Sequence, residues 1–310
     1  MPVIETYRSR LEAASCEVVV AEVRERLTEE QLLPLVKDID GAICGDDRFT
    51  ERVMLAAPRL RVLLKWGTGI APLDQEGAKC LGVRIYNTPG AFSEPVADTV
   101  PGYILLFARQ FGQMDRDIRE GRWIERQLVA SRETTLGAIG VGDCGRAVVR
   151  RAVAFGMRVL GMDIVEIPAD FIAQTGTEMM PLRELLATAD FVSVNCTLSP
   201  ASFHLIGERE LAVMKATAYL INAARGPIVD EAALIRALSG RQIAGAGLDV
   251  FESEPLPSDG PLRALDNCWL APHNANSGPE SAPRVHGRTI GNLIAGLHEP
   301  ARRDAAHAGA

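Results

Sequence analysis

Residues 136–163 read LGAIGVGDCGRAVVRRAVAFGMRVLGMD, and this stretch decides the fold. An apolar strand runs into the glycine motif at residues 140–145 (GVGDCG), a helix follows from Arg146 to Phe155, and a second strand ends at Asp163. A strand, a glycine turn, a helix and a strand in this order are typical of a βαβ unit that binds a dinucleotide.

Each glycine of the motif has its own physical task. Gly140 allows the tight turn, Gly142 lets the backbone approach a pyrophosphate, and Gly145 lets the helix pack on the strand. The backbone amides of Asp143 and Cys144, at the start of the helix, are expected to hold the phosphates. An ordinary strand-to-helix turn is the alternative, and the βαβ context favours dinucleotide binding over it.

The residues around Asp163 predict which dinucleotide is bound. An acid at the end of the second strand binds the ribose hydroxyls of NAD. Ile164, Val165 and Glu166 follow it, with no arginine, so a 2′-phosphate would meet repulsion and no partner. The sequence therefore favours NAD over NADP.

Two series of short apolar runs alternate with helix-like segments along the chain. The runs are 18–20, 41–44, 62–64 and 83–86 in the first series, and 136–139, 158–160, 191–194, 219–222, 246–248 and 269–270 in the second. This alternation predicts an α/β fold with two parallel-sheet units. The segment from Ser93 to about Gly121 has helical spacing and is expected to bridge them, with a kink or break at Pro101.

Composition narrows the possible functions. At 310 residues the chain is long enough for two domains, and its net charge of −7 argues against a nucleic-acid partner. No apolar run is long enough to cross a bilayer and the N-terminus does not resemble a signal peptide, so we expect a cytoplasmic protein. The six cysteines form no C-x-x-C pair and the five histidines show no metal-ligand spacing, so no metal site is predicted.

Three polar residues follow predicted strands closely: Arg225, Glu254 and His273. Open α/β sheets bind ligands beyond the carboxyl ends of their strands, so these side chains are expected to converge. Arginine can bind a carboxylate through two parallel hydrogen bonds, and histidine beside a carboxylate can move the proton of a hydroxyl group. A surface ion pair, a solvated loop residue and a structural histidine are the respective alternatives.

Three segments carry a family resemblance: residues 222–231 (NAARGPIVDE), 247–255 (GLDVFESEP) and 271–273 (APH). They resemble the D-isomer-specific 2-hydroxyacid dehydrogenases in sequence and in order, and the likeness covers nearly the whole chain. It implies that Arg225 binds substrate, that Glu254 and His273 form the acid/base pair, and that Asp249 contacts the nicotinamide carboxamide. The substrate would be a small anionic 2-hydroxy or 2-keto acid.

The resemblance also implies the domain plan. A Rossmann domain at residues 99–282 would be inserted into a flavodoxin-like substrate domain at residues 1–98 and 283–310, with NAD in the cleft between them. The chain looks most like the short members related to phosphoglycerate dehydrogenase, without the extra C-terminal regulatory domain. Family members are commonly dimers, so a homodimer is expected.

An early segment, residues 65–69 (KWGTG), resembles the family's substrate loop. The amides of Gly67, Thr68 and Gly69 could hold a carboxylate as a small anion nest, with Lys65 adding a point charge or else standing solvated. Arg48 is a weaker candidate of the same kind. The chain departs from the family pattern at Ala71-Pro72 and at Asn274, and these departures bear on substrate binding more than on cofactor binding.

Two rival functions stay open. Some corepressors resemble this family and sense NAD(H) with little turnover, and the presence of Arg225, Glu254 and His273 weighs towards catalysis without deciding it. Relatives that act on formate or phosphite are the other rival, and Glu254 argues against the formate type, whose pattern lacks this glutamate.

Overall fold

The computed structural model describes residues 4–23, 26–70, 72–278 and 281–299. Contacts divide the chain into two units, unit 1 with residues 1–91 and 278–310, and unit 2 with residues 92–277. The boundaries expected at 98 and 282 fall inside the helices α5 (Ser93–Ala108) and α12 (Ser281–His298). The contact-based divisions fall a few residues before these positions, and the domain boundaries at 98 and 282 stay a prediction. Ala71, one of the departures from the family pattern, lies outside the described residues.

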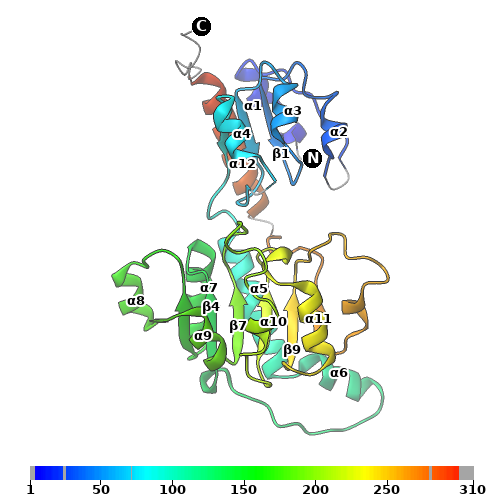
Figure 1. Cartoon of the computed structure of the whole chain (residues 1–310), viewed down its shortest axis with the longest axis vertical. Helices are drawn as coiled ribbons and strands as arrows, with labels where there is room; N and C mark the ends of the chain where they lie inside the picture. The colour runs from blue at the N-terminus through cyan, green and yellow to red at the C-terminus, as the bar shows by residue number, and fades with distance from the viewer. Residues whose placement is uncertain (1–3, 24–25, 71, 279–280, 300–310) are drawn as a thin grey trace. The chain divides into compact units, whose positions relative to one another are not determined.

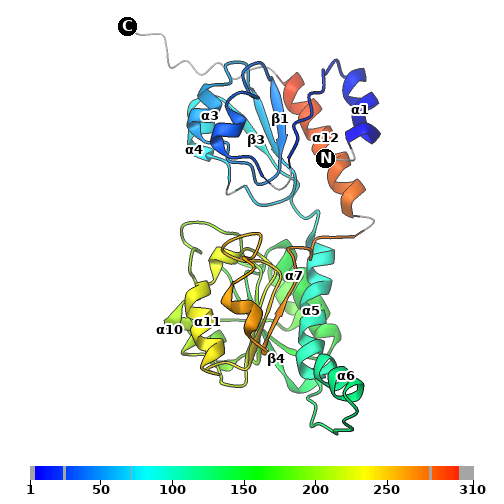
Figure 2. The same ribbon diagram turned by 90° about the vertical axis from the view of Figure 1, so that its right-hand side faces the viewer.

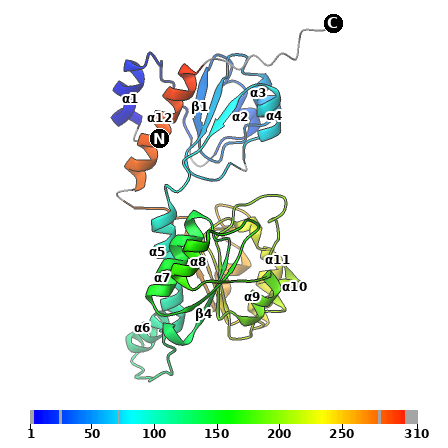
Figure 3. The ribbon, with the colours of Figure 1, turned by 90° about the vertical axis from the view of Figure 1, so that its left-hand side faces the viewer.

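Unit 1 contains a parallel sheet in the order β1-β2-β3, with helices on both faces. Its elements are α1 (Ile4–Ala13), α2 (Glu29–Leu32), β1 (Gly41–Cys44), α3 (Glu51–Leu55), β2 (Val62–Lys65), α4 (Gln75–Cys80), β3 (Arg84–Tyr86) and α12. Side chains of a strand point alternately to its two faces. Leu63 therefore packs in a core with Val53 of α3, whereas Val62 and Leu64 pack with Ile290 of α12. Figures 2 and 3 show α3 and α4 on one side of this sheet and α1 and α12 on the other.

The strand predicted at residues 18–20 is wrong. These residues have no strand conformation, and Val19 and Val20 are 77% and 48% exposed. Only Val18 packs against the core beside α12. Valine favours a strand where a neighbouring strand is present to pair with, and no strand of the described residues pairs with this segment.

Unit 2 contains a seven-stranded parallel sheet in the order β10-β9-β8-β7-β4-β5-β6 (Figure 1). Its strands are β4 (Thr135–Ile139), β5 (Arg158–Met162), β6 (Glu178–Met179), β7 (Phe191–Val194), β8 (Tyr219–Asn222), β9 (Gly245–Leu248) and β10 (Cys268–Leu270). Its helices are α5, α6 (Phe111–Arg119), α7 (Asp143–Ala154), α8 (Ala169–Thr175), α9 (Leu182–Thr188), α10 (Glu208–Leu211) and α11 (Glu231–Ser239), with short 3₁₀ turns η1 (Ser131–Glu133), η2 (Gly226–Ile228) and η3 (Pro261–Ala264). The α/β fold class with parallel sheets is confirmed, and the edge strand β6 was not predicted.

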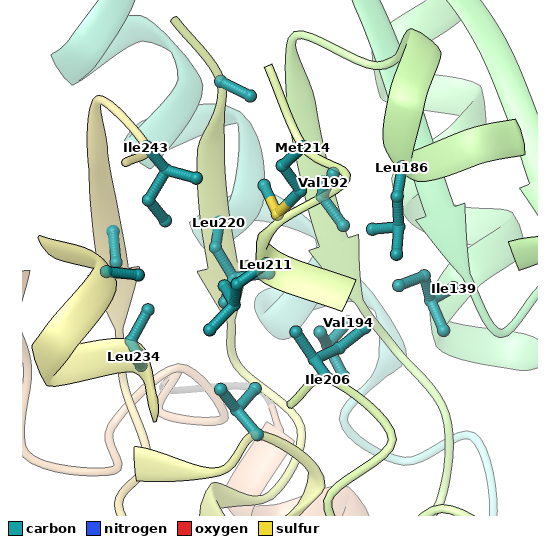
Figure 4. Close-up of a cluster of buried hydrophobic side chains, with 14 of the residues drawn as sticks. Ile139, Leu186, Val192, Val194, Ile206, Leu211, Met214, Leu220, Leu234 and Ile243 are labelled. Atoms are coloured by element: carbon teal, nitrogen blue, oxygen red, sulfur yellow. The ribbon is translucent and has the colours of Figure 1, made fainter. Parts of the chain in front are cut away.

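Each face of the unit 2 sheet has its own core. Leu220 of β8 joins a cluster with Leu186, Leu211 and Leu234, from helices α9, α10 and α11 (Figure 4). The next residue, Ile221, joins the opposite cluster with side chains from α5, α7 and α8. Strand order reverses between β4 and β7, because β5 and β6 lie on one side of β4 and β7 to β10 on the other. Such a reversal is where doubly wound sheets bind ligands.

The break expected at Pro101 is wrong too, since α5 runs through it to Ala108. An internal proline costs a helix about 3 kcal/mol. Helix α5 buries Val100, Ile104 and Phe107, and each such side chain contributes roughly 1.5–3 kcal/mol. The burial of these three side chains thus stabilises the helix by more than the proline destabilises it. The turn comes at Gln110, which has a left-handed φ of 48°, and both α5 and α6 belong to unit 2.

Candidate active site

The glycine turn follows β4 at the reversal of strand order. Gly140 has a φ of +87°, which favours glycine, and a Cβ there would lie 2.6 Å from the backbone nitrogen of Cys196. A Cβ on Gly145 would lie 1.9 Å from the carbonyl oxygen of Gly140. Helix α7 can therefore begin this close to β4 only because residue 145 has no side chain.

Gly142 is different, because a Cβ there would meet no atom within 4 Å. The backbone at this residue is open to a ligand. The amides of residues 142–145 donate no hydrogen bond to any part of the chain that the structure describes. Free amides at the start of a helix are donors suited to phosphate oxygens. An open glycine backbone and unpaired amides fit the pyrophosphate of a dinucleotide.

Asp163 lies at the end of β5 and its carboxylate is tied to the glycine turn. One oxygen accepts from the amide of Val141 at 2.6 Å, and the other accepts from the amides of Ile164 and Val165 at 2.7 and 3.1 Å. Each carboxylate oxygen can accept more than one hydrogen bond. Asp163 thus fixes the turn, and its oxygens can still accept a further hydrogen bond from a ribose hydroxyl. That contact with ribose stays a prediction.

The segment that follows β7 was missed by sequence reasoning. The close approach of Cys196 to Gly140 places this segment against the glycine turn. Its position was the available signal, because it follows a strand at the reversal of strand order, as the glycine motif does. The segment carries no recognised motif, so the sequence gave no other indication that it would lie beside the glycine turn.

Glu254 and His273 come together, on loops that follow the adjacent strands β9 and β10. His273 Nδ1 and Glu254 Oε2 lie 2.7 Å apart. The other carboxylate oxygen of Glu254 accepts from the amide of Phe251 at 2.9 Å. Because Nδ1 faces the carboxylate, the second ring nitrogen, Nε2, is the one left to meet a substrate. His273 has a left-handed φ of 50°, an uncommon backbone conformation that recurs at functional sites.

The carboxylate of Glu254 is stabilised in its charged form. Burial alone would raise the pKa of Glu254. The hydrogen bonds from His273 and the Phe251 amide, together with the charges of His273 and Arg225, outweigh burial and lower the pKa. Glu254 is therefore the negative partner that an imidazolium needs.

Arg225 follows β8, the next strand along the sheet. Its guanidinium donates to the carbonyl oxygen of Ala224 at 2.7 Å, and no carboxylate of the described residues forms an ion pair with it. Gly226 lets this loop approach the one after β9, since a Cβ on Gly226 would lie 1.9 Å from the carbonyl carbon of Phe251. The fold thus brings an arginine with no acid partner to the neighbourhood of Glu254.

Asp249, at the end of β9, is 1% exposed. Its two carboxylate oxygens accept from the amides of Asn274 and Ala275 at 2.9 and 2.8 Å, and its carbonyl oxygen accepts from the amide of His273 at 2.7 Å. Burial raises the pKa of Asp249 despite these bonds. The residue thus holds the backbone on both sides of His273, a structural task that the family resemblance did not imply. Its contact with the nicotinamide stays a prediction.

The loop at residues 65–69 lies in unit 1. Gly67 has a φ of 111°, its carbonyl oxygen accepts from the amide of Thr88 at 2.9 Å, and Asn87 Nδ2 donates to the carbonyl oxygen of Thr68 at 2.6 Å. The amides of residues 67–69 donate to no other group in the described ranges. The loop is held by its carbonyl groups, and its amides are available to an anion.

Lys65 is less available than the sequence suggested. Its side chain is 5% exposed, its Nζ lies 3.2 Å from Asp46 Oδ1 and donates to the carbonyl oxygen of Trp66 at 3.1 Å. Its charge is therefore already met by a carboxylate. Arg48 is exposed to solvent. Across the described ranges, no group of three or more histidine, cysteine, aspartate or glutamate residues is placed to hold a metal ion, and no helix is both long and apolar enough to cross a membrane.

Comparisons with known proteins agree with this geometry. Residues 102–275 match the family model described as "D-isomer specific 2-hydroxyacid dehydrogenase, NAD binding domain". A glyoxylate reductase of Korarchaeum cryptofilum is 39% identical over 275 residues, which cover 86% of this chain and 82% of that protein. A D-3-phosphoglycerate dehydrogenase of Methanocaldococcus jannaschii is 37% identical over 282 residues, which cover 90% of this chain and 53% of that protein. The crystal structure of D-lactate dehydrogenase from Aquifex aeolicus, complexed with NAD and lactic acid, has 26% identity and a TM-score of 0.85, and the match covers 95% of this chain and 92% of that one.

A Rossmann-type unit with a histidine–carboxylate pair beyond its strands defines an NAD-dependent oxidoreductase. The chain belongs to the D-isomer specific 2-hydroxyacid dehydrogenase family. The reaction of this family is hydride transfer between NAD(H) and a small acid, which interconverts a 2-hydroxy acid and the corresponding 2-keto acid. The family assignment made from the three sequence segments is confirmed.

Proposed function

We propose that the protein reduces a small 2-keto acid to the D-2-hydroxy acid with NADH, and catalyses the reverse oxidation with NAD. One observation supports the assignment of roles. Arg225 forms no ion pair with an acid of the described residues, and it lies near Glu254, whose Oε2 is 2.7 Å from His273 Nδ1. An unpaired guanidinium near an acid/base pair is suited to an anionic substrate whose hydroxyl or carbonyl group exchanges a proton.

Each residue then has a task in the reduction. Arg225 binds the substrate carboxylate through its planar guanidinium and so orients the keto group. Bound NADH would supply the hydride that C2 receives. His273, protonated, donates a proton from Nε2 to the carbonyl oxygen, which becomes the hydroxyl group of the product. Glu254 stabilises the protonated imidazole through Nδ1, and in the oxidation His273 takes the hydroxyl proton back.

The cofactor residues are proposed on the same basis. Gly140, Gly142 and Gly145, with the amides of Asp143 and Cys144, are assigned to the pyrophosphate because the amides are unpaired and Gly142 is open. Asp163 is assigned to the ribose hydroxyls. NAD fits this set because no basic side chain follows Asp163 along the chain to meet a 2′-phosphate.

We further propose that the substrate is a glyoxylate-sized keto acid without a phosphate group. The amides of Gly67, Thr68 and Gly69 are assigned to a carboxylate, which three amides suffice to bind. A phosphorylated substrate carries about two more negative charges and needs further cations. Lys65, the cation beside this loop, is already paired with Asp46, so we assign it to holding the loop through its bond to Trp66.

Steady-state oxidation of NADH with glyoxylate, pyruvate, hydroxypyruvate and 3-phosphohydroxypyruvate tests the proposal. We expect turnover with glyoxylate or another small keto acid, and the phosphorylated acid to be poorer. Arg225→Lys keeps the charge and loses the planar fork, so kcat/KM should fall by roughly 30- to 1,000-fold, as expected for about 2–4 kcal/mol. Tight NADH binding without turnover of any acid would instead support an NAD(H)-sensing protein.

We also propose that the protein is a homodimer formed through α6 and the segment at residues 120–130. Apolar side chains on this surface are exposed, Trp123 by 84%, Phe111 by 53% and Ile118 by 54%. Asp117, which is buried, accepts from Arg122 and Arg126 and fixes the segment in place. An ordered segment that exposes a tryptophan is typical of a protein–protein contact.

A groove beside α6 supports a second copy as the partner. It has a volume of about 340 Å³, and its lining combines aromatic side chains with charged ones, among them Phe107 of α5, Arg116 of α6, Tyr219 of β8 and Trp269 of β10. An isologous contact pairs the same surface of both copies, so an exposed side chain of one copy can enter a recess of the other. All six cysteines are free, which supports a reducing compartment such as the cytoplasm.

A further inference from the structure

Trp66, inside the loop at residues 65–69, is bound by a residue more than two hundred positions away. Its indole Nε1 donates to Nδ1 of His286 at 3.1 Å, and the two ring centroids lie 5.5 Å apart. His286 lies on α12, and this helix packs on β2, the strand that leads into the loop. Both residues belong to unit 1.

The surroundings of His286 fix which of its nitrogens accepts. The residue is 6% exposed, and its ring also contacts Tyr7 of α1, at 5.8 Å between centroids. Burial lowers the pKa of His286, which favours the neutral ring. With Nδ1 accepting from the indole, the proton of the neutral ring is on Nε2. A protonated Nδ1 could not accept this bond.

The same helix also holds the segment that braces the other side of the loop. Asn292 Nδ2 donates to the carbonyl oxygen of Asn87 at 3.3 Å, and Arg288 donates to that of Pro89 at 3.4 Å. Asn87 in turn donates to the carbonyl oxygen of Thr68. The loop therefore has two supports on α12, a direct one through Trp66 and an indirect one through Asn87.

We infer that His286 is a positioning residue for substrate binding: by accepting the indole N–H of Trp66, it fixes the loop whose amides at residues 67–69 hold the substrate carboxylate. The inference rests on the proposed function for the role of those amides. It does not involve contact between His286 and the substrate or the cofactor. Loss of the bond should therefore weaken acid binding and leave NADH binding and the chemical step unchanged.

Two substitutions of His286 separate the hydrogen bond from bulk. His286→Phe keeps a ring of similar size and removes the acceptor, whereas His286→Asn places an amide oxygen near the position of Nδ1. We expect His286→Phe to raise the KM for the keto acid about tenfold, as for one hydrogen bond in a partly buried site, with KM for NADH and kcat unchanged. His286→Asn should recover most of the loss. His298→Phe, an exposed position on the same helix, is the matched control.

Two-dimensional ¹H–¹⁵N NMR of the full-length protein detects the hydrogen bond between Trp66 and His286 without a measurement of enzyme activity. The chain has three tryptophans and so three indole N–H resonances, and the one lost in Trp66→Phe is assigned to Trp66. We expect this resonance to move in His286→Phe and to stay near its wild-type position in His286→Asn. Titration with oxamate, an unreactive analogue, should then show about tenfold weaker binding at the amides of Gly67 and Gly69 in His286→Phe.

The outcomes distinguish this inference from the proposed function. An indole resonance that moves while KM and oxamate affinity stay constant would overturn the positioning role, and so would an unmoved indole resonance. If the wild type turned over no keto acid, the proposed function would fail, and oxamate binding alone would then decide whether His286 positions the loop. Thermal unfolding followed by circular dichroism verifies that each variant is folded. If His286→Phe does not fold, His286→Asn still tests the inference, because a raised KM with an unmoved indole resonance in this variant would contradict it.

Discussion

At the scale of single residues, Asp163 shows how one carboxylate can serve both the fold and the cofactor. Its oxygens hold the amides of Val141, Ile164 and Val165 in the free protein, and its negative charge is the proposed barrier to a 2′-phosphate. Asparagine has no charge and retains one acceptor oxygen, which can serve the Val141 amide of the glycine turn, whereas its NH₂ group cannot accept from the amides of Ile164 and Val165.

Asp163→Asn should therefore narrow the preference for NADH over NADPH while leaving the glycine turn in place. We expect kcat/KM with NADH to fall about tenfold, as for a hydrogen bond to a charged group, and kcat/KM with NADPH to fall less or to rise. Asp163→Ala should in addition lower the melting temperature. Kinetics with both cofactors check this, and an NADH/NADPH ratio equal to that of the wild type would contradict the assigned role.

Glu254 makes a prediction about pH. Its lowered pKa keeps it ionised throughout the neutral range, so it stabilises the protonated form of His273. Glu254→Gln removes the charge and retains an acceptor for the Phe251 amide. Keto-acid reduction requires His273 protonated, so the variant should lose this activity at a lower pH than the wild type does. Hydroxy-acid oxidation, which requires the neutral ring, should gain activity at correspondingly lower pH.

The affinity for NADH is the control for Glu254→Gln, because the glutamate is not expected to touch the cofactor. The measurement is kcat/KM in both directions across pH, compared with NADH binding followed by fluorescence. If the pH profiles of the variant and the wild type coincided, Glu254 would be a bystander.

Sequence reasoning reached the site residues unevenly. Arg225, Glu254 and His273 were found because each lies within a few residues of the end of a predicted strand, and the structure places Glu254 and His273 in contact. The bonds from Asp249 to the amides after His273 could not be predicted, since they depend on the path of a loop backbone. The contact between Trp66 and His286 could not be predicted either, because the two residues are 220 positions apart and no sequence pattern links them.

At the scale of elements, the glycine turn offers a matched pair of substitutions. Gly145→Ala places a Cβ 1.9 Å from the carbonyl oxygen of Gly140, so α7 must shift from β4. Gly142→Ala meets nothing within 4 Å, and the φ of −70° at this position is allowed for alanine.

We expect Gly145→Ala to destabilise the protein by about 1–3 kcal/mol, as overpacking does, and to weaken NADH binding. Gly142→Ala should leave the melting temperature unchanged and weaken NADH binding by tenfold or more, because the methyl group takes space assigned to the pyrophosphate. Thermal melts and NADH titrations of both variants check this. Full NADH affinity in Gly142→Ala would remove the pyrophosphate from this turn.

The prediction of elements succeeded where burial dominates. The runs at residues 191–194 and 219–222 are strands with the predicted bounds, since each lies in the interior of the unit 2 sheet and is almost fully buried. It failed where the context of a residue outweighs its intrinsic preference. Val19 and Val20 are exposed to solvent, Pro101 is retained inside a well-packed helix, and the edge strand β6 is too short to show alternation.

At the scale of the whole molecule, the proposed dimer surface makes a prediction about mass. Trp123→Asp places a charge on the apolar surface of α6 and residues 120–130, and an unpaired charge is costly to bury in an interface. We expect the wild type to be a dimer and Trp123→Asp a monomer of 33.4 kDa by light scattering after size-exclusion chromatography.

Leu55→Asp is the matched control, because Leu55 is also a large exposed apolar residue, at 61%, and lies on α3 of unit 1. It should remain a dimer. A monomeric wild type, or a Trp123→Asp variant that stays dimeric, would exclude this surface as the interface.

Unit 1 is completed by residues from both ends of the sequence, since Val62 and Leu64 of β2 pack against Ile290 and Leu293 of α12. During translation at ~5–20 residues per second, β2 leaves the ribosome roughly 10 to 45 seconds before α12. Unit 2 is continuous, from residue 92 to 277, and can fold during this interval. One face of the β1–β3 sheet stays uncovered in the nascent chain meanwhile, so the half that is synthesised first is the last to fold and the one most in need of a chaperone near the exit tunnel.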